Sequence, residues 1–237
     1  MICLSGIFIT GTSSNVGKTV ITTCLTYAFR KRNIDAVPYK PVQCGAITEG
    51  EQWLAPDVEL YRKVYNPKEN EQLNSFLYEP RFSPHFAAQL ADAPIDPQVI
   101  KSNYHALQEG HELVLIEGAG GLAVPLIDEQ YGTPELIKDL DIPIVIVTQA
   151  SVGTLNATAL TAHYAQSKGL NIIGIIINGY PDNPTEGIKD NLTMIEKVTG
   201  IPVIGIVPQI ADVEARLGEE EVLEKLIGGI DLDKLYY

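Results

Sequence analysis

The sequence predicts an α/β fold in which helices cover both faces of a doubly wound, mostly parallel sheet. Short β-branched runs alternate with longer amphipathic segments along the 237-residue chain, which is the order of elements in α/β proteins. Several of the short runs are apolar throughout, as in strands that are covered on both faces. No linker, repeat or low-complexity tract divides the chain, so we expect a single domain over residues 1–237.

The strands are expected where β-branched and aliphatic residues gather in short runs bounded by turn residues. The first run leads directly into a glycine-containing loop, and the apolar start of the chain has no basic leader. We therefore interpret residues 1–10 as leading into a first strand and not as a signal peptide. The expected strands cover residues 7–10, 36–39, 113–117, 142–148, 172–178 and 203–207.

Between these strands lie segments with the length and apolar periodicity of amphipathic helices. The expected helices cover residues 18–32, 97–109, 155–168, 187–199 and 218–227. In a doubly wound sheet, ligands bind beyond the carboxyl ends of the strands. The residues that follow each apolar run are therefore the first candidates for a functional site.

The charge of the chain favours a small-molecule ligand. Lys and Arg number 17 against 30 Asp and Glu, which gives a formal net charge of -13. Such a surface repels nucleic acid and anionic lipid, so we expect neither as a partner, and a phosphate-bearing ligand must be held by a local site. No apolar stretch approaches the roughly 18 residues of an ordinary membrane span.

The cysteines indicate a reducing compartment. Cys3, Cys24 and Cys44 are odd in number and lack the CxxC spacing of a metal knuckle or a redox pair. We expect reduced thiols, no disulfide framework and a cytoplasmic location.

The first loop has the sequence of a phosphate-binding site. Residues 11–19 read Gly-Thr-Ser-Ser-Asn-Val-Gly-Lys-Thr and stand between an expected strand and an expected helix. This context predicts a Walker-type loop and a P-loop NTPase-like domain, in which backbone N–H groups, the helix dipole and Lys18 hold the phosphates of ATP while Thr19 ligates Mg²⁺. Thr12 stands where the usual pattern has its first glycine. The residues expected to contact the nucleotide here are Thr12, Asn15, Val16, Gly17, Lys18, Thr19 and Val20.

Carboxylates near the ends of other elements are candidates for completing the metal site. Glu117 ends an apolar strand and is followed by Gly118, Ala119 and Gly120, which allow a ligand to approach closely. Mg²⁺ prefers hard oxygen ligands of this kind. Asp57 is a second candidate, although its position also fits the N-cap of a helix that begins at Val58.

A second lysine follows another expected strand. Lys40 is followed by Pro41, which favours an extended turn and directs the ammonium toward the nucleotide region. The residues by themselves leave open an ordinary surface lysine at this position.

Four motifs, taken together, resemble the dethiobiotin synthetase family. They are the phosphate loop, Tyr39-Lys40-Pro41-Val42, Ser83-Pro84-His85 and Glu117-Gly118-Ala119-Gly120-Gly121, in that order along almost the whole chain. The resemblance implies an ATP-dependent cyclo-ligase of biotin biosynthesis. Its members insert CO₂ between the two amines of 7,8-diaminononanoate, through a carbamate and a carbamic-phosphoric anhydride, and release dethiobiotin, ADP and phosphate.

The resemblance also implies roles for particular residues. Thr19, Asp57 and Glu117 match the family's Mg²⁺ site, and Lys18 and Lys40 match its catalytic lysines. A homodimer is implied, with the active site at its interface. The residues that match the nucleotide-base site are Asn178, Gly179, Pro208, Gln209 and Ile210, and those that match the substrate site are Lys40, Cys44 and, from the partner subunit, Gly153, Thr154, Leu155 and Asn156.

The chain departs from the family pattern at several positions. Residues 13–15 read Ser-Ser-Asn where the family commonly has Asp, Thr and an acidic residue. Cys44 stands where a small hydroxyl residue is usual, and Ser151 stands where some members carry lysine. We expect His85 to have a structural or substrate-lining role and not to act as a general base.

Two other classes share the expected nucleotide domain. One is the ParA/MinD-like switch ATPase, whose signature lysine would fall at Ser13, and the chain lacks the basic face or amphipathic C-terminal anchor of that class. The other is a glutamine-dependent amidotransferase of the cobyrinate type, for whose glutaminase domain 237 residues leave no room.

Overall fold

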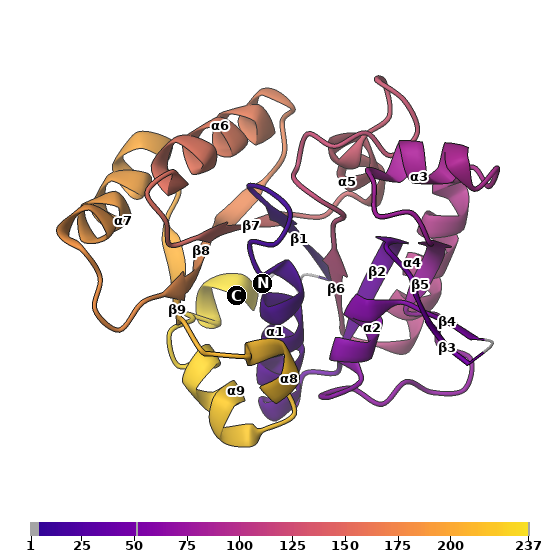
Figure 1. The fold of residues 1–237 in the computed structure, drawn as a ribbon, viewed down its shortest axis with the longest axis horizontal. Coiled ribbons are helices and arrows are strands. Elements are labelled where there is room, and N and C mark those ends of the chain that lie inside the picture. The colour runs from indigo at the N-terminus through magenta and orange to yellow at the C-terminus, as the bar shows by residue number, and fades with distance from the viewer. Residues whose placement is uncertain (1–4, 51, 237) are drawn as a thin grey trace.

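The computed structural model describes residues 5–50 and 52–236 and has the expected architecture (Figure 1). Its main sheet has seven strands in the order β5-β2-β6-β1-β7-β8-β9, and every neighbouring pair is parallel. The strands are β1 (Gly6–Gly11), β2 (Ala36–Cys44), β5 (Asn74–Tyr78), β6 (Leu113–Glu117), β7 (Ile144–Gln149), β8 (Ile172–Tyr180) and β9 (Val203–Pro208). The predicted fold class is therefore confirmed.

Alternate residues of the central strands enter two separate cores. Ile7 and Ile9 of β1 pack on one side of the sheet, and Phe8 packs on the other, because successive side chains of a strand point to opposite faces. The core that contains Ile7 is covered by α1 (Lys18–Lys31), α9 (Glu220–Ile227) and α10 (Asp233–Tyr236). The core that contains Phe8 is covered mainly by α3 (Pro84–Leu90), α4 (Pro97–Gly110), α5 (Thr133–Leu140), α6 (Thr154–Ser167) and α7 (Glu186–Thr199).

The six expected strands and five expected helices are all present, with ends that differ by a few residues. The strand expected from residue 142 begins at Ile144, after Pro143, which has no N–H to donate to a neighbour. The helix expected from residue 218 begins at Glu220, and a separate turn, α8 (Val213–Arg216), precedes it.

Several elements were not predicted from the sequence. They are the edge strand β5, the antiparallel pair β3 (Ile47–Glu49) and β4 (Gln52–Leu54), and the helices α3, α5, α8 and α10. Helix α2 (Pro56–Tyr61) was raised only as one of two readings of Asp57, with a start at Val58. Most of these elements are short, and β5 lies at the sheet edge with most of its residues only partly buried. Such elements lack the continuous apolar run by which a buried strand is recognised.

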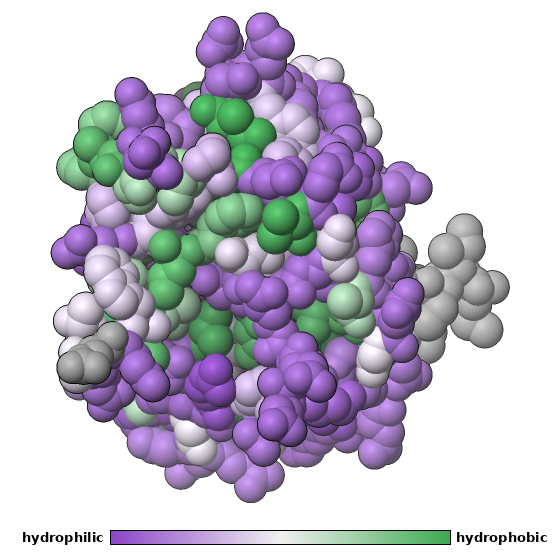
Figure 2. Space-filling model, turned by 90° about the vertical axis from the view of Figure 1, so that its right-hand side faces the viewer, coloured by the Kyte–Doolittle hydropathy of each residue, from purple (hydrophilic) through white to green (hydrophobic). Residues whose placement is uncertain are grey.

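The surface and the cysteines can be described for most of the chain. The face in Figure 2 is mostly hydrophilic, with apolar residues in separate clusters. Across residues 5–50 and 52–236, no helix is long and apolar enough to cross a membrane. Cys24 is buried and Cys44 half-buried, and both are free thiols. Cys3 lies outside the described residues.

Candidate nucleotide and metal site

The loop after β1 has the conformation of a phosphate cradle. Gly17 caps α1 in the left-handed conformation, with a φ of 95°, and Lys18 donates a hydrogen bond from Nζ to the Ser13 carbonyl oxygen, 3.0 Å away. Burial, and after it the nearby Lys40 ammonium, lowers the pKa of Lys18 to about 8. An anion that reached Lys18 would compensate for the loss of hydration, so the loop favours a phosphate ligand.

Other loop residues divide between the core and the solvent. The side chains of Val16 and Val20 are buried in the core under α1, so only their backbone could face a nucleotide. Ser13, Ser14 and Asn15, the residues that depart from the family pattern, are exposed. Thr12 Oγ1 lies 3.3 Å from Thr148 Oγ1 at the end of β7, which ties the loop to the neighbouring strand.

Lys40 lies inside strand β2 and is buried, with 4% of its surface exposed. The expectation of a turn at Pro41 is therefore wrong, and so is the reading of Lys40 as a surface lysine. Residues 36–39 of β2 pair with β6, whereas pairing with β5 begins at Lys40. β2 thus separates from β6 at Lys40, which opens the space through which its side chain reaches the end of β6.

A buried ion cluster occupies that space. Lys40 Nζ lies 2.7 Å from Glu117 Oε1 and 2.6 Å from Asp57 Oδ2, and it donates to the Gly118 carbonyl oxygen at 3.2 Å. Thr19 Oγ1 donates to Glu117 Oε1 at 2.9 Å, and the Tyr61 hydroxyl donates to Glu117 Oε2. Glu117 is 1% exposed, so the cluster joins the phosphate loop to β2, β6 and α2 away from water.

The electrostatics of the cluster call for a cation between the two carboxylates. Burial alone would lower the pKa of Lys40, but Glu117 and Asp57 outweigh it and raise that pKa above its usual value. Burial would raise the pKa of Asp57, but the Lys40 ammonium holds it below its usual value. Burial raises the pKa of Glu117, and Lys40 offsets only part of that shift.

The oxygen atoms around this cluster fit a magnesium ion. Thr19 is hydrogen-bonded to Glu117, and Asp57 shares the Lys40 ammonium with Glu117, so one hydroxyl and two carboxylates converge beside the phosphate loop. These are hard donors, and phosphate oxygens and water would complete octahedral coordination. Within residues 5–50 and 52–236, no three His, Cys, Asp or Glu side chains form a metal site by themselves, so binding would depend on Thr19 and on the nucleotide.

Asp57 is not the N-cap of a helix that begins at Val58. Helix α2 begins at Pro56, and Ala55 is its N-cap. Asp57 lies in the first turn, where the helix dipole favours a negative charge. Its backbone N–H is 3.4 Å from Gln43 Oε1.

The residues expected at the nucleotide base gather beside the phosphate loop. Asn178, near the end of β8, donates from Nδ2 to the Val16 carbonyl oxygen at 3.0 Å. The Gln209 N–H donates to the Tyr180 carbonyl oxygen at 2.8 Å, which joins the ends of β8 and β9. The candidates Asn178, Gly179, Pro208, Gln209 and Ile210 therefore lie together at the carboxyl ends of these two strands.

The segment expected to receive substrate in a partner subunit is mostly exposed. Gly153 and Asn156 are exposed and Leu155 is half-buried at the start of α6. Thr154 is different, because it is buried and its Oγ1 lies 2.9 Å from Thr148 Oγ1. The side chain of Thr154 is thus engaged within its own chain.

Cys44 and His85 lie on neighbouring elements. Cys44 ends β2, and burial raises the pKa of its thiol to about 11. His85 lies in the first turn of α3, and its buried Nδ1 has no hydrogen-bond partner among the described residues.

Tyr61 and Gln43 were missed by the sequence analysis. The signal that could have found Tyr61 is its spacing of four residues from Asp57, because residues at that spacing share one face of a helix. No comparable pattern marks Gln43.

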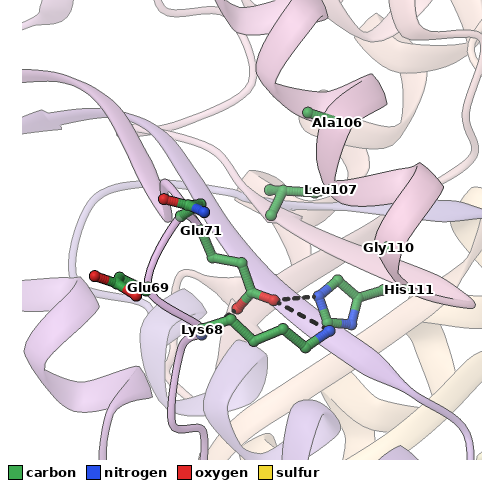
Figure 3. A pocket seen from close by; sticks show the side chains of 8 residues that line it. Lys68, Glu69, Glu71, Ala106, Leu107, Gly110 and His111 are labelled. Carbon is green, nitrogen blue, oxygen red and sulfur yellow. Dashed lines mark hydrogen bonds and ion pairs between the residues drawn. The ribbon is translucent and has the colours of Figure 1, made fainter.

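A separate hollow, shown in Figure 3, lies away from the ion cluster. It has a volume of about 380 Å³ and is lined by Lys68, Glu69, Asn70, Glu71, Ala106, Leu107, Gly110 and His111. His111 precedes β6 and contacts Asp35, which precedes β2. The hollow is therefore at the amino ends of these strands, away from Lys40 and Glu117.

Comparison with known proteins identifies relatives over most of the chain. Residues 5–216 match a family model described as an AAA domain. The ATP-dependent dethiobiotin synthetase BioD of Anoxybacillus flavithermus is 43% identical, over 88% of this chain and 94% of its own length. The protein of the same name from Halalkalibacterium halodurans is 37% identical, over 95% of this chain and 93% of its own.

Solved structures of much lower identity share the fold. A ParA family ATPase from Chlorobium tepidum aligns with a TM-score of 0.61 at 14% identity, over 98% of this chain and 99% of that one. A chain of the MinC:MinD cell division protein complex from Aquifex aeolicus aligns with a TM-score of 0.59 at 17% identity, over 97% and 93%. These two similarities show the fold alone, whereas the identity to the curated relatives shows the family. The chain belongs to the dethiobiotin synthetase family of ATP-dependent ligases.

Proposed function

We propose that this protein forms dethiobiotin from 7,8-diaminononanoate and CO₂, with ATP converted to ADP and phosphate. The observation that supports it best is the buried cluster in which the Lys40 ammonium lies between Asp57 and Glu117 beside Thr19 of the phosphate loop. We also propose that residues 1–237 act as one domain. The groups that bind the nucleotide and the metal, and those that act on the carbamate, would then all lie at the carboxyl ends of the strands of one sheet.

The proposed roles of the residues follow from their chemistry. Thr19, Asp57 and Glu117 would hold Mg²⁺, which supplies positive charge to the phosphates when bound. Lys18 and the N–H groups at the start of α1 would bind the β- and γ-phosphates. Asn178 and its neighbours on β8 and β9 would bind the base, since they adjoin the loop at Val16.

The proposed reaction has three bond-forming steps. One amine of the substrate attacks CO₂ and loses a proton, which gives a carbamate. A carbamate oxygen attacks the γ-phosphorus of ATP, and ADP leaves. The second amine attacks the carbonyl carbon of the mixed anhydride, phosphate leaves, and the ring closes within one molecule, so that positioning contributes strongly to the rate.

Lys40 and Lys18 would act where negative charge accumulates. Carbamate, γ-phosphate and carboxylates must meet in a buried space, and fixed cations stabilise such charge most where water is excluded. With Asp57 and Glu117 neutralised by a bound cation, the Lys40 ammonium would be able to turn toward the carbamate. Cys44 lies four residues further along β2, where it would line the substrate site.

We propose that the active site is completed by a second copy of the chain. The 153–156 segment would receive the substrate carboxylate of the partner's site, at the N-terminus of α6. An apolar surface beside it supports this assembly, because Val152 is 90% and Leu160 63% exposed. Phe82 and Phe86, which contact each other on and before α3, are also exposed.

A switch ATPase of the ParA/MinD class is not favoured. The structural similarity to that class comes with identities of only 14% and 17%. Ser13 stands where the signature lysine of that class would be.

The test is ADP release by the purified protein with and without the diamine and bicarbonate. We expect release to rise only when both are present, together with a product of the mass of dethiobiotin. ADP release that is unaffected by the diamine would contradict the proposed function.

A further inference from the structure

Tyr61 occupies a position that no assigned role explains. It is the last residue of α2, its side chain is 0% exposed, and it belongs to a hydrophobic core cluster together with Val58 and Tyr65. Its hydroxyl donates a hydrogen bond to Glu117 Oε2. Buried tyrosine hydroxyls usually donate a hydrogen bond. Here the acceptor is a carboxylate that is proposed to bind Mg²⁺.

The two oxygens of Glu117 have different partners. Oε1 accepts hydrogen bonds from Thr19 at 2.9 Å and from Lys40 at 2.7 Å. Oε2 accepts from Tyr61. When a metal displaces Lys40, the Tyr61 bond would still fix the rotation of the carboxylate and leave Oε1 directed at Thr19.

Helix α2 brings two groups to the same place. Asp57 and Tyr61 are four residues apart, so they project from one face of the helix. Asp57 contacts the Lys40 ammonium at 2.6 Å, and Tyr61 contacts Glu117, which binds the same ammonium. A tyrosine held by core packing has few alternative rotamers, so α2 can fix the distance between the two carboxylates.

We propose that Tyr61 is a positioning residue for the metal site, which orients Glu117 through its Oε2 atom and thereby sets the affinity for Mg²⁺ in the presence of nucleotide. The proposal rests on the proposed function only in that Glu117 is taken as a metal ligand. Hydrogen bonds to metal-binding groups typically change metal affinity by about 10- to 100-fold when they are removed.

The test is Tyr61→Phe, which keeps the ring and removes the hydroxyl. We expect Mg²⁺, titrated calorimetrically into protein saturated with a non-hydrolysable ATP analogue, to bind about 10-fold or more weakly. The affinity for the analogue in the absence of Mg²⁺ should stay within about 2-fold, and this second titration also shows that the variant is folded.

Tyr65→Phe is the matched control. Tyr65 lies four residues after Tyr61, is 3% exposed, and donates its hydroxyl to a carboxylate, that of Glu71, outside the proposed site. Its loss should lower the melting temperature without changing Mg²⁺ affinity. If both variants lose stability and neither changes the Mg²⁺ titration, Tyr61 is only a core residue.

A second pair of variants tests the route through Glu117. In a Glu117→Gln background, Tyr61→Phe should change Mg²⁺ affinity by less than about 2-fold, because neighbours that act through each other are not additive. A full-sized effect in that background would overturn the proposal. These titrations need no diamine, so failure to form dethiobiotin leaves them interpretable.

Discussion

At the scale of single residues, the buried ammonium of Lys40 has an electrostatic role in the free protein and a proposed role in catalysis, and the two can be tested separately. In the free protein it neutralises Asp57 and Glu117, and during turnover it is proposed to stabilise the charge that passes from the carbamate to the γ-phosphate. Removing one partner of a buried ion pair typically costs about 3–5 kcal/mol, because the remaining charge is left uncompensated.

We predict that Lys40→Ala lowers turnover by on the order of 10²-fold or more at saturating diamine and bicarbonate. ATP affinity should fall much less, because Lys18 and the loop amides remain. The variant should also melt at a lower temperature, and Mg²⁺ should restore its melting temperature more than it raises that of the unaltered protein, since the ion replaces the lost ammonium between the carboxylates. Near-normal dethiobiotin formation by Lys40→Ala would exclude the catalytic role.

Lys18→Ala is the informative comparison. Lys18 lies on the phosphate loop and contacts Ser13, so its loss should impair equilibrium ATP binding as well as turnover. The two lysines are thus distinguished by pairing rate measurements with ATP titration.

Glu71 is a residue whose ionisation stabilises the fold away from the site. It accepts hydrogen bonds from the Tyr65 hydroxyl, the Lys68 backbone N–H and His111 Nε2, and Figure 3 shows its carboxylate in contact with the side chains of Lys68 and His111. Burial would raise the pKa of Glu71, but these partners, Tyr65 foremost, hold it at about 2. The folded-state pKa is below the unfolded value of 4.5, so this stabilisation is present above about pH 4.5 and is lost as the pH falls toward 2.

We therefore predict that Glu71→Gln lowers the free energy of unfolding at pH 7 by on the order of 2 kcal/mol. The loss should shrink as the pH approaches 2, because the carboxyl of the unaltered protein is then protonated too. Urea unfolding at pH 7 and pH 3 measures it, with the exposed neighbour Glu69 changed to Gln as control. Equal stability of Glu71→Gln and the unaltered protein at pH 7 would contradict the assignment.

At the scale of elements, strand β2 explains both what the sequence predicts and what it conceals. The Lys40 N–H donates to the Leu73 carbonyl oxygen on the β5 side, and successive residues of a parallel strand direct their backbone groups to alternate sides. Pro38 therefore faces the β5 side before pairing with β5 begins, and Pro41 faces the β6 side after pairing with β6 has ended. The missing N–H of each proline therefore points to a side on which β2 has no paired strand at that position, and no ladder hydrogen bond is lost.

Sequence patterns were sufficient where burial is continuous. β1, β6 and β7 are apolar and covered on both faces, so their composition predicts them. The loop after β1 was found because glycine and lysine at this spacing, between a strand and a helix, are typical of phosphate-binding loops. The edge strand β5, the β3–β4 pair and the short helix α2 carry weaker patterns. The contact of Tyr61 with Glu117 depends on segments 56 residues apart in the chain, which no local pattern reveals.

The phosphate loop as an element depends on Gly17. Its φ of 95° is strained for a residue with a side chain, and an added Cβ would lie 1.9 Å from Asn178 Nδ2. We predict that Gly17→Ala weakens ATP binding by at least about 10-fold, on the order of 1.4 kcal/mol, because the loop and the Asn178 amide must both move.

Gly187→Ala is the control for this substitution. Gly187 lies in α7 with nothing within 4 Å of an added Cβ, so alanine should be neutral or stabilise the helix. Isothermal titration with ATP and a thermal melt of both variants distinguish a local steric effect from a general one. ATP affinity of Gly17→Ala equal to that of the unaltered protein would show that the loop binds nucleotide in another conformation.

At the scale of the whole molecule, exposed apolar side chains lie on elements near the carboxyl ends of the strands, where the candidate site lies. In Figure 1, α6 and α3 lie on either side of the loop that follows β1. Both carry exposed apolar side chains, among them Leu160 and Phe86. A net charge of -13 opposes association at long range, so a stable contact requires apolar burial at a defined patch.

We predict a symmetric homodimer whose interface includes the turn of residues 151–156. Val152 is 90% exposed at this turn, and an apolar side chain so exposed is expected to be buried by the partner. Val152→Glu should therefore raise the dimer dissociation constant by about 10-fold or more, which corresponds to roughly 1.4 kcal/mol, and should lower turnover at low protein concentration, since the partner would supply residues 153–156. Sedimentation velocity across a concentration series, run with parallel rate measurements, gives both quantities.

The matched control is Val198→Glu. Val198 is 41% exposed near the end of α7. Because α7 follows β8 and returns along the sheet, Val198 lies toward the amino ends of the strands, away from the turn of residues 151–156. This control should leave both association and rate unchanged, so an equal effect of the two substitutions would mean that added charge, and not a lost contact, is responsible. A monomer that keeps full activity at the concentration of the assay would show that each chain completes its own site.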